Sequence, residues 1–328
     1  MLKVFYFNKN NNIRYEIIKV NETLPKNTIW IDIVEPKYNE KNYIEKILGI
    51  EAPNKKEMEK HEVINPFFVE NEVNYMTATV LDRGSKDYPD SIAITFIIKD
   101  QYLITTRFQK AKSFDYFNSW ICRNKIKKCT NDFILINIID LMVNCCADIL
   151  KEAGNKINNI LNIVFEKPID KNKNSSNIYN DIIRKIGSTG TLISRNRESL
   201  VSLNRLIIFF SQIENGKYMN KKDIRLKIKH ITREINSMSE FANFLSKRNG
   251  FLLEATLGMI SVEQNIIIKF FTVAAVIFMP PTLIASIYGM NFNNMFVLKT
   301  EYGFEFILFI IIISAFAPYI LFKKKGLL

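Results

Sequence analysis

The chain has 328 residues, 48% of them hydrophobic and 24% charged, with a formal net charge of +12. This composition excludes both a disordered chain and a protein lying wholly within a membrane, and the length allows more than one domain. The four cysteines and two histidines lack metal-ligand spacing, and no glycine-rich phosphate loop is present, so we do not expect an enzyme or a zinc finger.

Residues 1–130 alternate between strand-like and helix-like patterns, which predicts an α/β domain. Segments rich in β-branched and aromatic residues predict strands. These segments are Leu2–Tyr6, Arg14–Ile18, Ile29–Val34, Val73–Leu81, Ile92–Ile98 and Tyr102–Thr106. Two further segments, Asn39–Leu48 and Lys55–Glu62, have helical spacing.

Residues 131–220 predict two long helices that form an antiparallel hairpin. The first runs from Asp132 to Glu166, and the Asp132 side chain is placed to cap it. The second runs from Ile178 to Ile213 and is weakened at Gly187 and Gly190.

A third helix begins near Lys221, because no proline occurs from there to Pro280 and apolar residues recur every three or four positions. Residues 221–269 form a stalk that leads into the first uncharged stretch. If the helix continues to Tyr288 it is about 100 Å long at 1.5 Å per residue. A rod of that length needs neighbouring helices, so we expect bundling or oligomerisation.

Two uncharged stretches, residues 270–288 and 306–322, are long enough to cross a membrane as helices. They cover about 28 Å and 25 Å, close to the hydrocarbon core of about 30 Å. We therefore expect a multi-pass protein of the plasma (inner) membrane, with residues 289–305 forming a short extracytoplasmic loop.

Basic residues lie just outside these two stretches. Lys269 precedes the first, and Lys323, Lys324 and Lys325 begin the tail of residues 323–328. Because cytoplasmic flanks are enriched in Lys and Arg, we expect both termini in the cytoplasm. The same positive charge has an alternative interpretation, a basic helix face that binds nucleic acid and consists of Lys221, Lys222, Arg225, Lys227, Lys229 and Arg233.

One face of the first span collects small polar side chains at heptad spacing. Its members are Asn265, Ile268, Thr272, Ala275, Met279, Thr282 and Ser286. Such residues commonly assist helix packing in lipid. Alternatively, several copies of this face surround a narrow pore, in which Met279, Ile268 and the adjacent Phe271 form apolar constrictions.

The absence of acidic residues from the span restricts how such a pore could select an ion. No Asp or Glu occurs between Glu263 and Glu301, so neutral oxygens would have to select the ion. Mg²⁺ loses its water reluctantly, which suits a ring of carbonyl oxygens that contacts a hydrated ion. Pro280 and Pro281 remove two backbone donors and are expected to bend the helix.

The segment from Ile277 to Phe292, which contains Tyr288-Gly289-Met290-Asn291, resembles the CorA family of divalent-cation channels, as do the two spans and the basic tail. Upstream, Val69–Tyr75 and Tyr102–Thr106 resemble strand segments of the family. The resemblance implies an α+β membrane protein: a funnel-shaped homopentamer with an N-terminal cytoplasmic α/β domain and a stalk helix continuous with the first of two C-terminal spans.

The resemblance also implies roles for individual residues. Gly289, Met290 and Asn291 form the selectivity filter, and Asn291 contacts hydrated Mg²⁺. The matching pore-lining positions are Asn265, Ile268, Phe271, Met279 and Thr282, while the four lysines form a basic collar. Ser286 stands where many relatives have glycine, and Met295–Leu298 replaces the usual Met-Pro-Glu-Leu loop.

Regulation by cytoplasmic Mg²⁺, held by acidic residues between neighbouring domains, is a further implication of the resemblance. The candidate acids are Asp82, Asp87, Asp90, Asp223 and Glu254. For each of them, a solvated surface charge is the more ordinary explanation.

The sequence thus favours a passive Mg²⁺ influx channel that also accepts Co²⁺. The alternatives are a Zn²⁺ or Co²⁺/Ni²⁺ transporter on the same scaffold and, in a different class, a membrane-anchored structural or nucleic-acid-binding protein. On the leading reading, the partners are the lipid bilayer and further copies of the chain, without nucleic acid.

Overall fold

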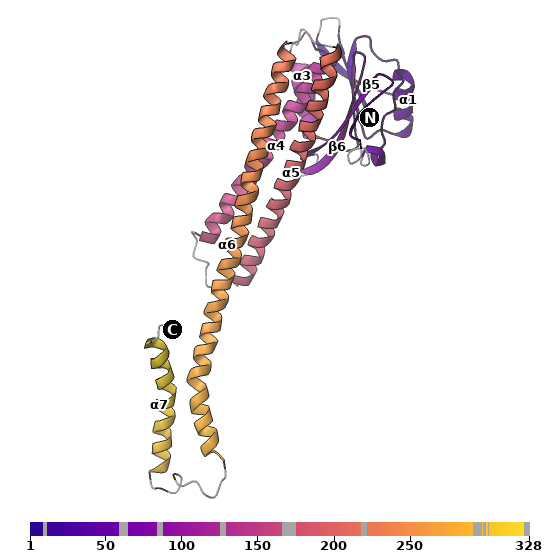
Figure 1. Ribbon diagram of the computed structural model, residues 1–328. Coiled ribbons are helices and arrows are strands. Elements are labelled where there is room, and N and C mark those ends of the chain that lie inside the picture. The colour runs from indigo at the N-terminus through magenta and orange to yellow at the C-terminus, as the bar shows by residue number, and fades with distance from the viewer. Residues whose placement is uncertain are drawn as a thin grey trace. The chain divides into compact units, whose positions relative to one another are not determined.

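The computed structural model describes residues 1–8, 12–58, 65–83, 88–124, 129–165, 175–217, 222–290, 297, 300 and 302–324 (Figure 1). The chain forms two compact units, Met1–Leu252 and Leu253–Leu328. Each unit has its own packing.

A mixed β-sheet of seven described strands organises the first unit. The strands are β1 (Leu2–Phe7), β2 (Ile13–Ile18), β3 (Thr28–Val34), β4 (Phe67–Glu70), β5 (Val73–Asp82), β6 (Asp90–Lys99) and β7 (Tyr102–Arg107). Their order is β2-β1-β3-β7-β6-β5-β4, and β3 and β7 run parallel while the other neighbours are antiparallel. All six predicted strands are present. The residue patterns did not predict β4, which is four residues long and only partly buried.

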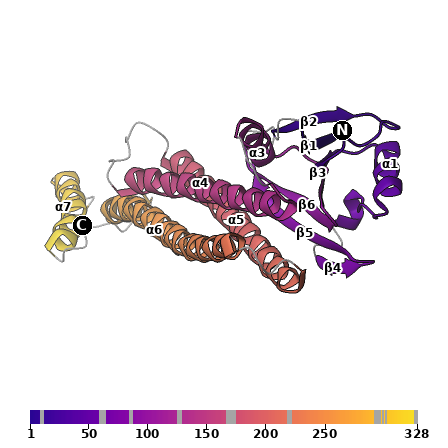
Figure 2. The same cartoon turned by 90° about the horizontal axis from the view of Figure 1, so that it is seen from above.

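Helices cover both faces of the sheet (Figure 2). On one face, α1 (Tyr38–Leu48) buries Ile44 and Leu48 against sheet residues such as Ile31. On the other, α3 (Lys112–Arg123) brings the Phe117 ring to 5.5 Å from the Trp30 ring. The sequence patterns did not predict α3, because its aromatic residues have low helix propensity.

The predicted helix Lys55–Glu62 is partly within the described residues. Residues 55–58 are helical, and residues 59–64 lie outside the described part. Asn54 and Glu57 form a reciprocal cap: the Glu57 N–H donates to Asn54 Oδ1 at 2.9 Å, and the Asn54 N–H donates to Glu57 Oε2 at 2.7 Å.

Helix α4 (Asn131–Phe165) confirms the first long helix, but its cap differs from the prediction. The Phe133 N–H donates to Thr130 Oγ1 at 3.4 Å, so Thr130 rather than Asp132 caps the helix. A hydroxyl and a carboxylate are both suitable caps, and the sequence alone did not locate the first helical residue. The end predicted at Glu166 lies outside the described part.

Helix α5 (Ser175–Lys217) packs against α4 and also along the edge of β5 (Figure 1). β4 pairs with β5 only as far as Met76. Beyond that point, the Leu81 N–H donates to Ser199 Oγ at 2.7 Å, and the Thr79 N–H donates to Ser202 Oγ at 3.0 Å. Serine side chains of α5 therefore satisfy backbone donors that an exposed sheet edge would leave to another strand.

Helix α6 (Lys222–Tyr288) is continuous, as the sequence predicted. In the first unit, Lys227 Nζ lies 2.5 Å from Asn137 Oδ1 and 3.3 Å from an Asp140 oxygen on α4. Asn249 Nδ2 donates to the Ile186 carbonyl on α5 at 3.2 Å. An added Cβ at Gly190 would lie 3.0 Å from Asn249 Nδ2, so the absence of a side chain at Gly190 permits this close approach.

The second unit contains the end of α6 and the antiparallel helix α7 (Gly303–Lys324). Three described helices, α4, α6 and α7, are apolar and long enough to span a membrane. The most apolar window of α4 is 56% buried inside the protein, whereas the windows of α6 and α7 are 0% and 6% buried. Helix α4 is therefore a core helix, and the two predicted spans remain as the membrane candidates.

A buried ion pair joins the parallel strands β3 and β7. Arg107 Nη2 lies 2.8 Å from Asp32 Oδ2, and the two side chains are 2% and 0% exposed. The Thr105 hydroxyl donates to Asp32 Oδ1 at 2.9 Å, and the Arg107 guanidinium lies 4.2 Å from the centre of the Phe114 ring. Each buried charge thus has a partner.

Substituting Asp32→Ala should lower the free energy of unfolding by about 3–5 kcal/mol, because Arg107 is then buried without its counter-ion. Asp181→Ala breaks the exposed pair with Lys185 and should cost less than about 1 kcal/mol. Guanidinium unfolding followed by the fluorescence of Trp30 and Trp120 measures both. Equal losses in the two variants would contradict the importance of the buried pair.

Candidate functional site

The end of α6 remains helical through two consecutive prolines. Pro280 and Pro281 have no N–H to donate, so the carbonyls four residues earlier, those of Val276 and Ile277, receive no intrahelical bond from them. The helix nevertheless continues to Tyr288. The prolines therefore leave two carbonyl acceptors within an apolar stretch.

All eight predicted pore-lining residues are exposed in the single chain. They are Asn265, Ile268, Phe271, Thr272, Ala275, Met279, Thr282 and Ser286. The largest of them are well over half exposed: Ile268 at 61%, Phe271 at 67% and Met279 at 69%. No other part of the described chain covers this stripe.

The half-buried residues of the same stretch lie on the opposite face of α6. These residues share about half of the helix circumference and are Val273, Ala274, Val276, Ile277, Pro280, Pro281, Ile284 and Tyr288. At 3.6 residues per turn, their mean direction lies roughly 180° from that of the exposed stripe.

Helix α7 runs back alongside this half of α6 (Figure 1). Its own buried or half-buried side chains also share one face, and they are Ile307, Ile310, Ile311, Ser314, Ala315, Pro318 and Phe322. The half-buried face of α6 and the half-buried face of α7 are therefore inferred to be those on which the two helices approach each other. The stripe therefore faces away from α7.

The two threonines of the stripe direct their hydroxyl hydrogens into their own helix. Thr272 Oγ1 donates to the Ile268 carbonyl at 2.8 Å, and Thr282 Oγ1 donates to the Phe278 carbonyl at 2.7 Å. Each hydroxyl then offers only acceptor lone pairs to its surroundings. The water shell of a cation presents hydrogens outward, so these acceptors suit a hydrated cation better than an anion.

The stretch expected to form the filter begins directly after α6. The Gly289 N–H donates to the Ala285 carbonyl at 2.8 Å, and the Met290 N–H donates to the Ile287 carbonyl at 3.3 Å. Both residues are exposed. The third residue, Asn291, lies outside the described part of the chain.

The described lysines of the predicted basic collar lie at the same end of the two predicted spans, because α6 and α7 are antiparallel. Lys269 precedes the uncharged stretch of α6, and Lys323 and Lys324 end α7. All three are exposed. Lys325 lies outside the described residues.

The candidate regulatory acids have different surroundings. Asp82 is buried, and its two carboxylate oxygens accept the N–H groups of Lys112 at 2.8 Å and Ser113 at 3.1 Å, at the start of α3. It is therefore not a solvated surface charge. Asp90 is its partner in the β5–β6 register and lies 3.9 Å from an Arg195 nitrogen.

The other candidate acids are not gathered into one cluster. Asp223 and Glu254 are both exposed on α6, and Asp87 lies outside the described part. Among the described residues, no group of three or more His, Cys, Asp or Glu side chains could hold a metal ion. The described candidate acids therefore do not form a metal site within one chain.

Glutamates that the sequence analysis had not singled out line a pocket of about 460 Å³ beside α1, among them Glu45, Glu51, Glu57 and Glu70. Two of these carboxylates accept hydrogen bonds from backbone N–H groups. Glu45 Oε1 accepts the Ala52 N–H at 2.8 Å, and Glu57 belongs to the cap described above. Their local sequence carries no motif, because the pocket joins segments far apart in the chain.

The cysteines have the character of core residues. Cys129 and Cys146 are buried, and burial raises the pKa of the Cys129 and Cys145 thiols to about 12. Burial raises the pKa of Cys146 further still. Since the thiolate is the reactive form, these thiols are poor nucleophiles and metal ligands.

Comparison with known proteins gives the fold and the family. The model of the family described as CorA-like Mg²⁺ transporter protein matches residues 25–324. The magnesium transport protein CorA of Campylobacter jejuni (strain RM1221) is 29% identical over 98% of this chain and 99% of its own length. The magnesium transport protein CorA of Pasteurella multocida (strain Pm70) is 26% identical over 91% of each chain.

Among solved structures, the complete CorA magnesium transporter from Methanocaldococcus jannaschii superposes with a TM-score of 0.77 at 16% identity, covering 99% of this chain and 98% of that one. Members of this family are ion transporters of membranes and not enzymes. The family match over most of the sequence and the shared fold place this chain in the CorA family.

Proposed function

We propose that the chain is a passive Mg²⁺ influx channel, in which five copies of α6 surround the ion path. The observation that carries the proposal is the exposed stripe of α6, which has neutral oxygens and no carboxylate and faces away from α7. Family membership adds the class of ion.

Besides the face toward α7, the α6 span exposes two sets of side chains that suit two different surroundings. The stripe meets its copies and the ion path, while Phe270, Phe278 and Leu283, which are 71%, 69% and 61% exposed, would contact lipid. In the first unit, Phe244 and Phe251 are 56% and 58% exposed on α6. Large exposed apolar side chains favour association, in keeping with several copies of the chain.

Selection of Mg²⁺ would occur at Gly289, Met290 and Asn291. In our proposal Asn291 side-chain oxygens contact the water shell of the ion, because Mg²⁺ exchanges its water reluctantly. The threonine oxygens of Thr272 and Thr282 then accept hydrogen bonds from the same shell farther along the path. The apolar side chains of Ile268, Phe271 and Met279 would narrow the ion path.

The membrane potential supplies the driving force. Moving one elementary charge through 100 mV is worth about 2.3 kcal/mol, so a divalent ion gains about twice that per 100 mV. With the basic collar and both termini in the cytoplasm, an inside-negative potential drives influx without nucleotide hydrolysis. Co²⁺ would follow the same path.

Cytoplasmic Mg²⁺ would also regulate the channel by favouring the closed state. Of the candidate acids, Asp223 and Glu254 are exposed and therefore available to a neighbouring copy, whereas Asp82 is buried at the start of α3. A fall in internal Mg²⁺ would release the interface and shift the population toward the open state.

Substituting Asn291→Ala should abolish selective Mg²⁺ uptake into liposomes, because the proposed contact with the hydrated ion is lost. Asn294→Ala, which changes the same side chain in the same loop, should retain uptake. A Mg²⁺-sensitive dye inside the liposomes measures the rate under an inside-negative potential, and Co²⁺, Ni²⁺ and Zn²⁺ arms rank the ions. Unchanged uptake in Asn291→Ala would refute the filter, and faster Zn²⁺ uptake would favour the zinc alternative.

Thr282→Val keeps the shape of the side chain and removes the oxygen acceptor. Loss of one hydrogen bond of about 0.5–1.5 kcal/mol should slow Mg²⁺ flux by roughly threefold to tenfold. Thr300→Val removes a hydroxyl that donates to the Val297 carbonyl outside α6 and should leave the flux unchanged. Equal rates for the two variants would contradict a role for Thr282 in the ion path.

Native mass spectrometry from lipid nanodiscs tests the number of copies. The protein should appear at five times the 38.3 kDa mass of one chain. Phe251→Ser, which removes an exposed apolar side chain, should lower the fraction of the five-copy particle. A single-chain mass for the unaltered protein in lipid would contradict the proposal.

A further inference from the structure

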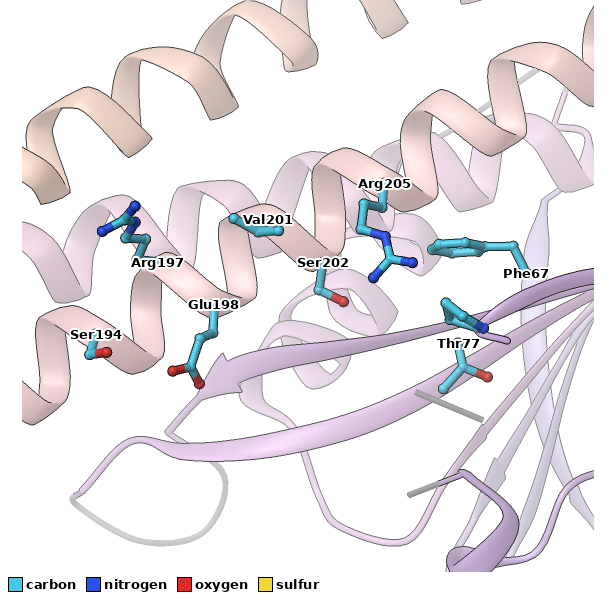
Figure 3. Close-up of a pocket in the computed structure, with 9 residues that line it drawn as sticks. Phe67, Thr77, Ser194, Arg197, Glu198, Val201, Ser202 and Arg205 are labelled. Atoms are coloured by element: carbon cyan, nitrogen blue, oxygen red, sulfur yellow. The ribbon is translucent and has the colours of Figure 1, made fainter. Parts of the chain in front are cut away.

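A pocket of about 410 Å³ lies in the first unit between α5 and the strands β4 and β5 (Figure 3). Its lining residues are Pro66, Phe67, Thr77, Ser194, Arg197, Glu198, Val201, Ser202 and Arg205. Six of them recur along α5 at spacings of three or four and so occupy one helix face. The volume falls in the range of about 300–1,000 Å³ that is typical of small-molecule sites.

One end of the pocket presents hydrogen-bond donors. The Arg205 guanidinium lies 5.6 Å from the centre of the Phe67 ring, and Figure 3 shows it beside Phe67 and Ser202. A position over the ring leaves the N–H groups of the guanidinium available to a ligand. Ser202 Oγ accepts the Thr79 N–H, so its own hydrogen can be donated to a ligand.

A second arginine lies farther along the same helix face. Arg197 precedes Arg205 by eight residues, which is about 12 Å along the helix axis. Within the part of the chain that the structure describes, no ion pair involves Arg197, Glu198 or Arg205. A small inorganic anion cannot contact both guanidinium groups, whereas an extended anion can.

The remaining lining residues of the pocket are apolar or acidic, and each kind restricts which ligand can bind. Pro66 and Val201, the latter 52% exposed, are apolar lining residues against which part of an organic ligand can lie. Glu198 lies between the two arginines and would repel bare phosphate. A phosphate chain carrying Mg²⁺ removes this repulsion, because Mg²⁺ is commonly held by a carboxylate together with phosphate oxygens.

We propose that this pocket binds a nucleoside polyphosphate as its Mg²⁺ complex. Arg205 and Ser202 hold one end of the phosphate chain, Arg197 the other, Glu198 contacts the metal, and the base lies against Pro66 and Val201. The proposal rests on the geometry of the first unit and not on ion conduction by α6. Binding can therefore be measured separately from flux.

Calorimetric titration of the full-length protein in nanodiscs tests the site with three probes: ATP with Mg²⁺, ATP with EDTA, and inorganic phosphate. We expect saturable binding of Mg²⁺-ATP, weaker binding of metal-free ATP, and much weaker binding of phosphate. Arg205→Ala should weaken Mg²⁺-ATP binding about tenfold or more, because a charge-assisted hydrogen bond is lost. Glu198→Gln should remove the difference between the two ATP probes.

Arg184→Ala is the matched control, since Arg184 is an exposed arginine of α5 outside the pocket. It should bind as the unaltered protein does, and thermal unfolding of every variant checks that the fold is retained. Absence of Mg²⁺-ATP binding, or equal binding by Arg205→Ala, would overturn the site. Phosphate binding as tight as that of ATP would overturn the class of ligand.

Discussion

The structure depends on one constraint: the C-terminal half of a single continuous helix exposes apolar surface that its own chain does not bury. Helix α6 is held by α4 and α5 through Lys227 and Asn249 in the first unit. In the second unit its most apolar window is 0% buried. Such a surface is stable only in contact with lipid or with other protein. Membrane insertion and self-association would therefore have the same physical cause.

The side chains around α6 indicate which surroundings each of its faces suits. One face meets α7, and the opposite face carries hydroxyls, an amide and a few large apolar side chains. Thr272 and Thr282 donate their hydrogens to backbone carbonyls and so present acceptors only. A path lined in this way favours a cation that keeps its water, and it does so without any acidic side chain.

The sequence predicted the elements whose periodicity is strong, namely the six strands, the long helices and the two spans. It did not predict α3, whose aromatic residues favour strands, or β4, which is short and half exposed. The cap of α4 differed because Thr130 and Asp132 are both suitable capping residues.

Contacts that join distant segments carried no local signal in the sequence. Asp82 looked like a possible regulatory ligand, but it lies buried against the start of α3. The sequence pattern at Gly190 did not indicate that its missing side chain permits the close approach of Asn249. The stripe of α6 was visible because helical spacing alone places its members on one face.

Cysteine accessibility along α6 tests the central claim most directly. Single cysteines are introduced after replacement of the two half-buried native cysteines, Cys122 and Cys145. They replace Thr272, Thr282 and Ser286 on the stripe, and Val273, Ile277 and Ile284 on the face toward α7. The account predicts that a water-soluble thiol reagent modifies the first group rapidly in lipid and spares the second. Equal reaction of both groups, or faster reaction on the α7 side, would contradict an aqueous path along the stripe.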